Sequence, residues 1–281
     1  MLNNNTKLDN LFRLDNKIIV VTGASGLLGQ KHAEAIAAYG GTPILLDLET
    51  NTVDELAKKI NKKYDVGAVG FAVDITNEEK VKQSSFQIVE KFKKIDGLVN
   101  NAANNPKVED TNDNNFSRLE NFPLETWNQD ISVGLTGAFL CAKYFGSIIS
   151  QNPNGGSIVN ISSDLGLIAP DQRLYSQPGE LDHHQPVKPI TYSVIKTGII
   201  GLTRYLATYW TSQNVRCNAL CPGGVESSQP EDFLQKVSIR IPMGRLASKD
   251  EYQGTLLWML SDASSYLNGA IIPVDGGRTA W

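Results

Sequence analysis

The sequence is poor in cysteine and carries little excess charge. Its three cysteines, Cys141, Cys217 and Cys221, are an odd number, and their spacing matches neither a metal motif nor a disulfide framework. We therefore predict free thiols in a reducing compartment. Lysine and arginine total 26 against 30 aspartates and glutamates, a net charge of −4, so there is no electrostatic reason to expect nucleic acid or an anionic membrane as a partner.

Long hydrophobic runs and targeting signals are also lacking. The longest apolar runs, such as the one within residues 17–21, fall far short of the ~18 residues needed to span a bilayer. The first ten residues are polar rather than signal-like, and we expect a cytoplasmic protein that acts on a small molecule. The 281 residues, of which 41% are hydrophobic, suit a single domain over 1–281 with a flexible segment at 1–12.

Short β-branched runs alternate with amphipathic stretches along most of the chain. This alternation is typical of βαβ units, which build a parallel sheet covered by helices on both faces. The sequence therefore predicts an α/β fold, with a Rossmann-type, doubly wound, seven-stranded parallel sheet in a single domain. The predicted strands cover residues 18–22, 43–47, 68–73, 97–100, 157–162, 215–220 and 270–274.

Three helix starts are marked by capping boxes, in which a hydroxyl residue stands three positions before a carboxylate. These boxes begin at Thr52, Thr76 and Ser248. We expect the hydroxyl of each to cap the first turn of a helix.

Two stretches, 104–122 and 164–191, interrupt this alternation with polar residues and prolines. Loops longer than about 12–15 residues in a compact domain are usually lids, binding loops or surface excursions. Both stretches follow strands at the carboxyl edge of the predicted sheet, where ligands bind in open α/β folds. We therefore interpret them as two enlarged active-site loops that act as lids.

A glycine-rich turn joins the first predicted strand to the next amphipathic stretch. It contains Gly23, Gly26 and Gly29, with Ser25 and Leu28 between them. Such a turn lets the backbone approach a pyrophosphate, whose charge meets the free N–H groups and the positive dipole end of the helix. The same pattern also serves tight packing of a helix on a strand, but a strand before it and a helix after it favour a dinucleotide site.

Acidic residues end the second and third predicted strands. Asp47 follows Gly29 by 18 residues, and no basic residue lies within three positions of it. A carboxylate here accepts hydrogen bonds from the ribose hydroxyls of NAD and repels the extra phosphate of NADP, so we expect NAD, with NADP disfavoured. Asp74, with Ile75 beside it, is placed either to contact the adenine or to cap the following helix.

Tyr192 and Lys196 are four residues apart, so on a helix they share one face. A phenol with a pKa near its usual value of ~10 is a poor base at neutral pH, and a nearby cation stabilises the phenolate. We expect Tyr192 to exchange a proton with a substrate oxygen. Ser162 and Ser163 end the fifth predicted strand and supply a hydroxyl to the same site.

These motifs together resemble a short-chain dehydrogenase/reductase of the single-domain branch, over residues 17–277. By this resemblance Ser163 orients the reacting oxygen, Tyr192 is the general acid and base, and Lys196 supports both. The resemblance also implies a homo-oligomer, a dimer or a tetramer formed through the helices around 127–149 and 192–210. The residues expected to bind the cofactor are Gly23, Ser25, Gly26, Leu28, Gly29, Asp47, Asp74, Ile75, Asn101, Ala102, Ala103, Tyr192, Lys196, Pro222, Gly223 and Val225.

The sequence departs from the family pattern at four places. The glycine spacing is that of the larger sugar-nucleotide branch, and Ala103 replaces the last residue of the family's NNAG motif. Gly134 stands where the family has a proton-relay asparagine, so either an ordered water or another side chain would take over the relay. Ser163 lies 29 residues before Tyr192, more than is usual, which keeps Ser162 open as the catalytic hydroxyl.

The two enlarged loops are polar, which favours a sugar or polyol over a steroid or lipid. Residues 187–198 and 276–281 are similar to PtmA-like oxidoreductases of bacterial surface-sugar and flagellin-modification clusters, which implies a sugar-derived substrate with Arg118 or Arg173 as anion contacts. The adjacent His183 and His184 have no third ligand nearby, so we expect no metal. Two alternatives stay open: an NAD-retaining sugar-nucleotide epimerase or dehydratase, and a non-catalytic dinucleotide sensor.

Overall fold

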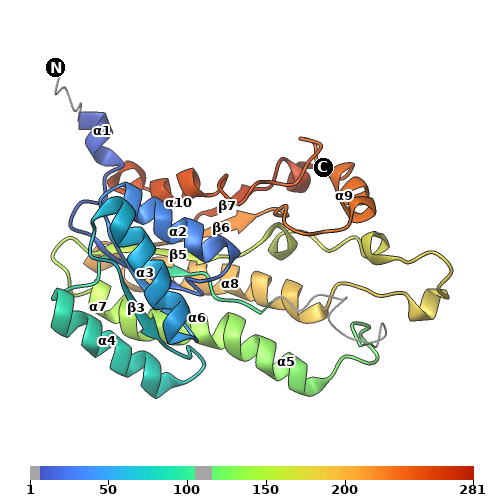
Figure 1. Ribbon diagram of the computed structural model, residues 1–281, viewed down its shortest axis with the longest axis horizontal. Helices are drawn as coiled ribbons and strands as arrows, with labels where there is room; N and C mark the ends of the chain where they lie inside the picture. The colour runs from blue at the N-terminus through green and yellow to red at the C-terminus, as the bar shows by residue number, and fades with distance from the viewer. Residues whose placement is uncertain (1–6, 105–115) are drawn as a thin grey trace.

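A computed structural model describes residues 7–104 and 116–281 and confirms the doubly wound parallel sheet (Figure 1). All neighbouring strands pair in parallel, in the order β3-β2-β1-β4-β5-β6-β7. The predicted strands agree with the observed ones to within two residues. The strands are β1 (Ile18–Thr22), β2 (Thr42–Asp47), β3 (Val69–Ala72), β4 (Gly97–Asn100), β5 (Gly156–Ile161), β6 (Val215–Pro222) and β7 (Ile271–Val274).

Helices cover both faces of the sheet because side chains alternate along each strand. In β1, Ile19 and Val21 belong to the core beneath α2 (Leu27–Ala38), α3 (Thr50–Tyr64) and α10 (Gln253–Leu260). Ile18 and Val20 belong to the core on the opposite face. That face is covered by α4 (Glu78–Phe92), α6 (Gly137–Cys141), α7 (Ser147–Ile149) and α8 (Ile190–Tyr209). Ile131 of α5 (Leu124–Ile131) packs against Ile195 and Ile199 of α8.

The helix over residues 124–149 is continuous but contains two π-helical segments, Ser132–Thr136 and Ala142–Gly146. It is the one described helix that is long and apolar enough to cross a membrane by length and composition. Leu140, Phe145 and Ile149 bury its inner face against the sheet. The helix therefore packs as a core helix.

The expected N-caps are wrong in detail. Thr52 lies inside α3, which begins at Thr50, and Asn77 rather than Thr76 caps α4 by accepting the Lys80 N–H at 3.1 Å. At the third box Glu251 does accept the Ser248 N–H at 2.8 Å, but α10 begins only at Gln253. The hydrogen bond between Glu251 and the Ser248 N–H therefore stabilises the turn that precedes α10. Such side-chain to backbone hydrogen bonds also form in turns outside helices.

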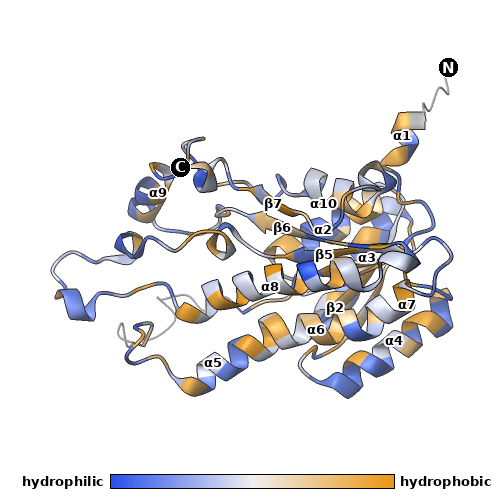
Figure 2. Ribbon diagram, turned by 180° about the vertical axis from the view of Figure 1, so that it is seen from behind, coloured by the Kyte–Doolittle hydropathy of each residue, from blue (hydrophilic) through white to orange (hydrophobic). Residues whose placement is uncertain are grey.

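The enlarged loop at 164–191 lies at the carboxyl edge of the sheet. Residues 164–191 carry three short 3₁₀ turns, Asp164–Gly166, Gln172–Tyr175 and Asp182–His184, and extend alongside α9 (Glu231–Ser238) (Figure 1). This extension is largely hydrophilic (Figure 2). Most of the other loop, at 105–115, and the first six residues of the expected flexible segment lie outside the described residues; residues Lys7–Leu11 form α1.

Candidate active site

A cavity of about 1170 Å³ lies along the carboxyl edge of the sheet. It runs from the glycine turn after β1 to the segment that precedes α8. The enlarged loop at 164–191 forms part of its wall through Leu174, Gln177 and Lys188 among others. The predicted site residues that line this cavity are Gly23, Gly26, Leu28, Asp47, Asp74, Ile75, Asn101, Ala102, Ala103, Ser163, Tyr192, Lys196, Pro222, Gly223 and Val225.

The glycine turn fits a pyrophosphate, although its glycines serve two different purposes. Gly23 has a φ of +60° and a Cβ there would lie 2.8 Å from Ala102 Cα, so only glycine suits this position. Gly29 does not line the cavity: a Cβ on it would lie 2.1 Å from Gly23 O, so it allows α2 to pack on the turn. Ser25, unlike Gly23 and Gly26, does not line the cavity, but its buried hydroxyl has no hydrogen-bond partner among the described residues, as suits a group beside a phosphate oxygen.

The acidic ends of β2 and β3 form the far end of the cavity. Asp47 accepts the N–H groups of Ser25 at 2.9 Å and Leu48 at 2.8 Å, which fixes its carboxylate beside the glycine turn. Asp74 accepts both the N–H and the hydroxyl of Thr76, at 2.9 and 2.7 Å. Both carboxylates line the cavity, so the local turn contacts of Asp74 and a contact with adenine are compatible.

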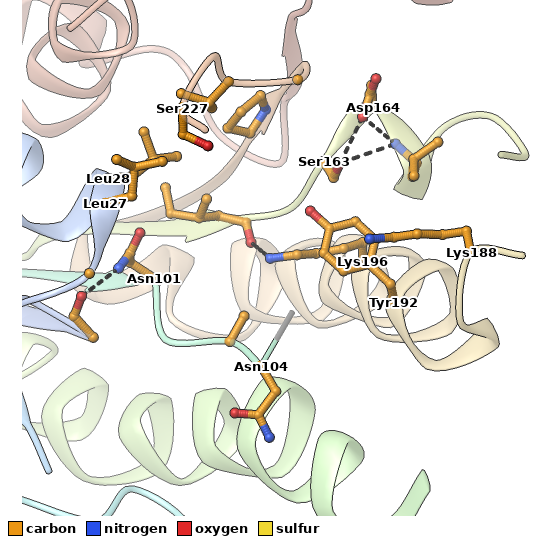
Figure 3. A pocket seen from close by; sticks show the side chains of 18 of the residues that line it. Leu27, Leu28, Asn101, Asn104, Ser163, Asp164, Lys188, Tyr192, Lys196 and Ser227 are labelled. Atoms are coloured by element: carbon orange, nitrogen blue, oxygen red, sulfur yellow. Dashed lines mark hydrogen bonds between the residues drawn. The ribbon is translucent and has the colours of Figure 1, made fainter. Parts of the chain in front are cut away.

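Asn101 holds the ends of β1 and β4 together beneath the cavity. Its Nδ2 donates to the carbonyl oxygens of Thr22 and Gly23, both at 3.0 Å (Figure 3). The backbone N–H groups of Asn101 and Ala102 in turn donate to Thr22 Oγ1, at 3.0 and 3.1 Å. These bonds fix the turn on which a cofactor would lie.

The two serines at the end of β5 have different partners. Ser162 Oγ donates to the backbone carbonyl of Lys196 at 2.7 Å and so ties β5 to α8. Ser163 Oγ donates to Asp164 Oδ1 at 2.7 Å, and its side chain lies beside the phenol of Tyr192 (Figure 3). Ser163, rather than Ser162, is therefore the hydroxyl next to the phenol.

Tyr192 and Lys196 project from the first turns of α8 into the cavity (Figure 3). Lys196 Nζ donates to Ile161 O at 2.9 Å and lies 5.7 Å from the centroid of the Tyr192 ring. Burial lowers the pKa of Lys196 to about 8, and the nearby Lys188 cation adds to this. Burial also raises the pKa of Tyr192, although its hydrogen bond with Ser163 opposes this shift. The expected lowering of the phenol pKa is therefore wrong for the protein without a cofactor.

Lys188 is a site residue that sequence reasoning placed only among the polar residues of a loop. Its Nζ lies 4.2 Å from the centroid of the Tyr192 ring. Burial lowers the pKa of Lys188 to about 8, partly offset by Asp164. Two ammonium groups, those of Lys188 and Lys196, thus approach the same phenol.

The expected anion contacts, Arg118 and Arg173, do not line the cavity. Arg118 donates to the backbone carbonyls of Asp182 and Gln185, and the Arg173 side chain is 82% exposed and paired with Asp171. The basic residues that line the substrate end are Lys188, Lys236 and Arg278. Arg118 and Arg173 each form an ion pair with an acidic residue two positions away, Glu120 and Asp171, and so do not serve as the expected anion contacts.

No metal site is found in the described parts of the chain. Among residues 7–104 and 116–281, no group of three or more His, Cys, Asp or Glu side chains could hold a metal ion. The rings of His183 and His184 lie 4.1 Å apart between centroids and are exposed.

Gly134 is buried within the first π-helical segment. A Cβ at this position would lie 2.6 Å from Cγ2 of the buried Ile195. Ile195 therefore fills the space into which a side chain at 134 would extend. A relay through an ordered water or through another side chain stays a prediction.

Comparison with known proteins agrees with this geometry. A family model described as short chain dehydrogenase matches residues 17–176, and a second, described as Enoyl-(Acyl carrier protein) reductase, matches residues 182–279. The chain belongs to the short-chain dehydrogenase/reductase family. It is thus an oxidoreductase that acts on alcohols with an NAD(P) dinucleotide, which is the group that the glycine turn and Ser25 fit.

Several individual relatives cover almost the whole chain. Trans-4-hydroxycyclohexanecarboxylate dehydrogenase of Sinomonas cyclohexanicum is 31% identical and the match covers 95% of each chain. D-threitol dehydrogenase of Mycolicibacterium smegmatis is 30% identical, again over 95% of each. The structure of an NAD+-bound xylitol dehydrogenase superimposes with a TM-score of 0.81 at 26% identity, covering 94% of this chain and 99% of that one.

Proposed function

We propose that this short-chain dehydrogenase/reductase uses NAD(H) to interconvert a secondary alcohol and a ketone on a small, polyhydroxylated substrate, a sugar or sugar derivative. The observation that carries the proposal is the meeting of Ser163, Tyr192 and Lys196 in a cavity that continues to the glycine turn. A substrate oxygen beside Tyr192 would therefore lie next to the nicotinamide end of a bound dinucleotide.

The preference for NAD over NADP rests on the far end of the cavity. Asp47 and Asp74 place two carboxylates there, and none of the described residues that line this end is basic. An extra phosphate on the adenosine ribose would meet negative charge without a cation to balance it.

The bound nicotinamide supplies the hydride chemistry, and the protein's own groups handle the proton. Tyr192 takes the proton from the substrate hydroxyl in oxidation and returns it in reduction. Since burial raises the pKa of this phenol, the phenolate needs positive charge close by, which Lys196 and the oxidised, cationic cofactor provide. Lys196 would also hold the nicotinamide ribose, and Ser163 would orient the substrate oxygen.

The proposed substrate class is supported by the residues that line the cavity away from the glycine turn and the ends of β2 and β3. Polar side chains stand there beside the apolar ones of Leu174, Phe233 and Val237. Such a mixed lining suits several hydroxyl groups better than a flat hydrocarbon. The names of the D-threitol and xylitol dehydrogenases, and the resemblance to enzymes of surface-sugar modification, support the same class. The polar groups that line this part of the cavity include Gln177, Lys188, Asp232, Lys236 and Arg278, whereas Ser227 lies near Leu28 of the glycine turn (Figure 3).

The direct test is a panel of polyols, sugars, sugar phosphates and nucleotide sugars, each assayed with NAD and with NADP by absorbance at 340 nm. We expect net NADH formation with one group of polyhydroxylated alcohols and slower reaction with NADP. An epimerase or dehydratase that retains its cofactor would convert a nucleotide sugar with no net absorbance change. A sensor would bind NADH but convert nothing, and either result would overturn the proposal.

We also propose that the protein is a homo-oligomer through α5 to α8. Phe139, Tyr205 and Tyr209 are between 49% and 62% exposed on these helices, and the rings of Tyr205 and Tyr209 stack with their centroids 5.5 Å apart, so these helices present neighbouring large rings to a partner. Size-exclusion chromatography with light scattering should give a dimer or tetramer, and a monomer would contradict the proposal.

A further inference from the structure

The substrate end of the cavity carries more basic than acidic side chains. Three basic residues line this end against two acidic ones, among the residues that the structure describes. The chain as a whole has the opposite excess, with a net charge of −4. The residues concerned are Lys188, Lys236 and Arg278 on the basic side and Asp164 and Asp232 on the acidic side. The positive excess is therefore a property of this end of the cavity and not of the protein surface in general.

Both acidic residues of the substrate end already face a cation. Arg278 Nη1 donates to Asp164 Oδ2 at 2.9 Å, and the two side chains are only 10% and 4% exposed. Lys236 Nζ lies 4.0 Å from Asp232 Oδ2 and also donates to the Ser176 carbonyl oxygen at 3.3 Å. The charges of Arg278 and Lys236 are thus each set against a carboxylate of the protein itself.

Lys188, the third cation, is held over the catalytic phenol by the segment that precedes α8. Its backbone N–H donates to Gln172 Oε1 at 2.8 Å, and Pro186 and Pro189 restrict the chain on either side of it. The Lys188 side chain runs along the Tyr192 ring, and its Nζ lies 4.2 Å from the ring centroid (Figure 3). The ammonium therefore lies inside the cavity, beside the ring whose hydroxyl acts on the substrate.

The surroundings of Lys188 disfavour its positive charge. Burial lowers the pKa of this ammonium to about 8, and Asp164 offsets only part of that shift. A partly desolvated cation is stabilised when an anion binds next to it. Because the lysine ammonium is a compact point charge, it suits a carboxylate and a phosphate alike.

The position of the ammonium limits where such an anion can be attached. The reacting oxygen of the substrate lies beside the Tyr192 hydroxyl, and Lys188 Nζ lies against the same ring. An anionic group that reaches Lys188 is therefore carried on a carbon close to the reacting one.

We propose that the substrate carries an anionic group, a carboxylate or a phosphate, close to the reacting carbon, and that Lys188 binds this group. The inference deepens the proposed function and rests on it, since it concerns the substrate of the same site. Lys188 thereby takes the part that the sequence predicted for Arg118 or Arg173.

The test uses sets of alcohols that share one carbon chain and differ at one terminal carbon. In each set that carbon is a neutral CH2OH group, a carboxylate or a phosphate ester, and the first sets are built on threitol, xylitol and glucitol. Turnover of each compound with NAD is followed at 340 nm. Isothermal titration gives the Kd of each alcohol for the enzyme with NADH, a combination that cannot react.

For the wild type we expect kcat/KM for the preferred anionic alcohol to exceed that for its neutral counterpart by at least about tenfold. The Kd values should differ in the same direction, and the arm with the higher kcat/KM identifies the anion as carboxylate or phosphate. Equal values for neutral and anionic alcohols, or a preference for the neutral one, would overturn the inference.

Lys188→Met tests the residue, because it keeps a long side chain and removes the charge. The ratio of the neutral Kd to the anionic Kd should fall by about tenfold or more in this variant. Lys249→Met, which changes an exposed lysine outside the cavity, is the matched control and should leave both Kd values unchanged.

A purely structural role for Lys188 predicts a different result. Lys188→Met would then weaken the binding of neutral and anionic alcohols by the same factor, and the unchanged ratio would overturn the inference. If Lys188→Met does not fold, Lys188→Gln decides by the same ratio. Failure of the proposed function is distinguishable, because the wild type would then convert no alcohol in any arm.

Discussion

His32 gives a prediction that can be worked through quantitatively. It lies on α2, one turn after the glycine-rich turn, and its side chain is fully buried. Neither ring nitrogen has a hydrogen-bond partner among the described residues. Burial alone lowers the pKa of this imidazole from 6.5 to about 4. The folded protein therefore keeps His32 neutral at pH values where the unfolded chain takes up a proton.

The sign and size of the effect follow by linkage. Because the folded pKa is depressed, the contribution of His32 to stability is fully present above pH 6.5 and is lost as the pH falls toward 4. Between pH 8 and pH 5 the free energy of unfolding should fall by about 2 kcal/mol on account of this residue, since one pKa unit corresponds to about 1.4 kcal/mol.

The assay is urea unfolding of wild type and of His32→Leu at pH 8 and pH 5, at one protein concentration. Leucine is close to histidine in volume and does not titrate, so the variant should lose about 2 kcal/mol less stability than the wild type over this interval. The matched control, His183→Leu, changes an exposed histidine and should behave as wild type. Equal pH dependence in wild type and His32→Leu would refute the reasoning.

Three further predictions test separate parts of the site. Asp47→Ser should raise the ratio of kcat/KM with NADP to kcat/KM with NAD by about tenfold or more, because it removes the carboxylate that repels the extra phosphate. An unchanged ratio in the 340 nm assay would count against NAD as the proposed cofactor. Arg278→Met should lower the free energy of unfolding by about 3 kcal/mol, because it leaves the buried carboxylate of Asp164 without its ion pair. Arg245→Met breaks an exposed ion pair and should lower it by less than about 1 kcal/mol. Equal losses in urea unfolding would contradict this. Ser163→Ala should lower kcat/KM by about a hundredfold or more. Ser162→Ala should lower it by less than about tenfold, since the Ser162 hydroxyl ties β5 to α8 through the Lys196 carbonyl. The reverse order would assign the catalytic role to Ser162.

The strands and the glycine turn could be predicted because local patterns determine them. In β1 the run Ile18–Val21 is apolar at every position, as a strand covered on both faces requires. Gly23 and Asp47 lie at the carboxyl ends of adjacent strands, so the strand order alone brings them together. The same holds for Tyr192 and Lys196, whose four-residue spacing places them on one face of α8.

The substrate end could not be predicted in this way. Lys188 has the sequence context of a surface loop residue, and only the folding of residues 164–191 into short turns brings it over Tyr192. The contact between Arg278 and Asp164 joins residues 114 apart and follows no local spacing. The N-cap predicted at Thr52 is wrong although the sequence around it has the capping pattern, because α3 begins two residues earlier, at Thr50.

The central claim is that the phenol of Tyr192 moves a proton beside a bound nicotinamide, and Tyr192→Phe tests it most directly. NADH affinity is measured by fluorescence titration and turnover at 340 nm on the same protein samples. The account predicts that the variant binds NADH nearly as tightly as the wild type while its turnover is abolished. Retained turnover, or loss of NADH binding together with activity, would contradict it.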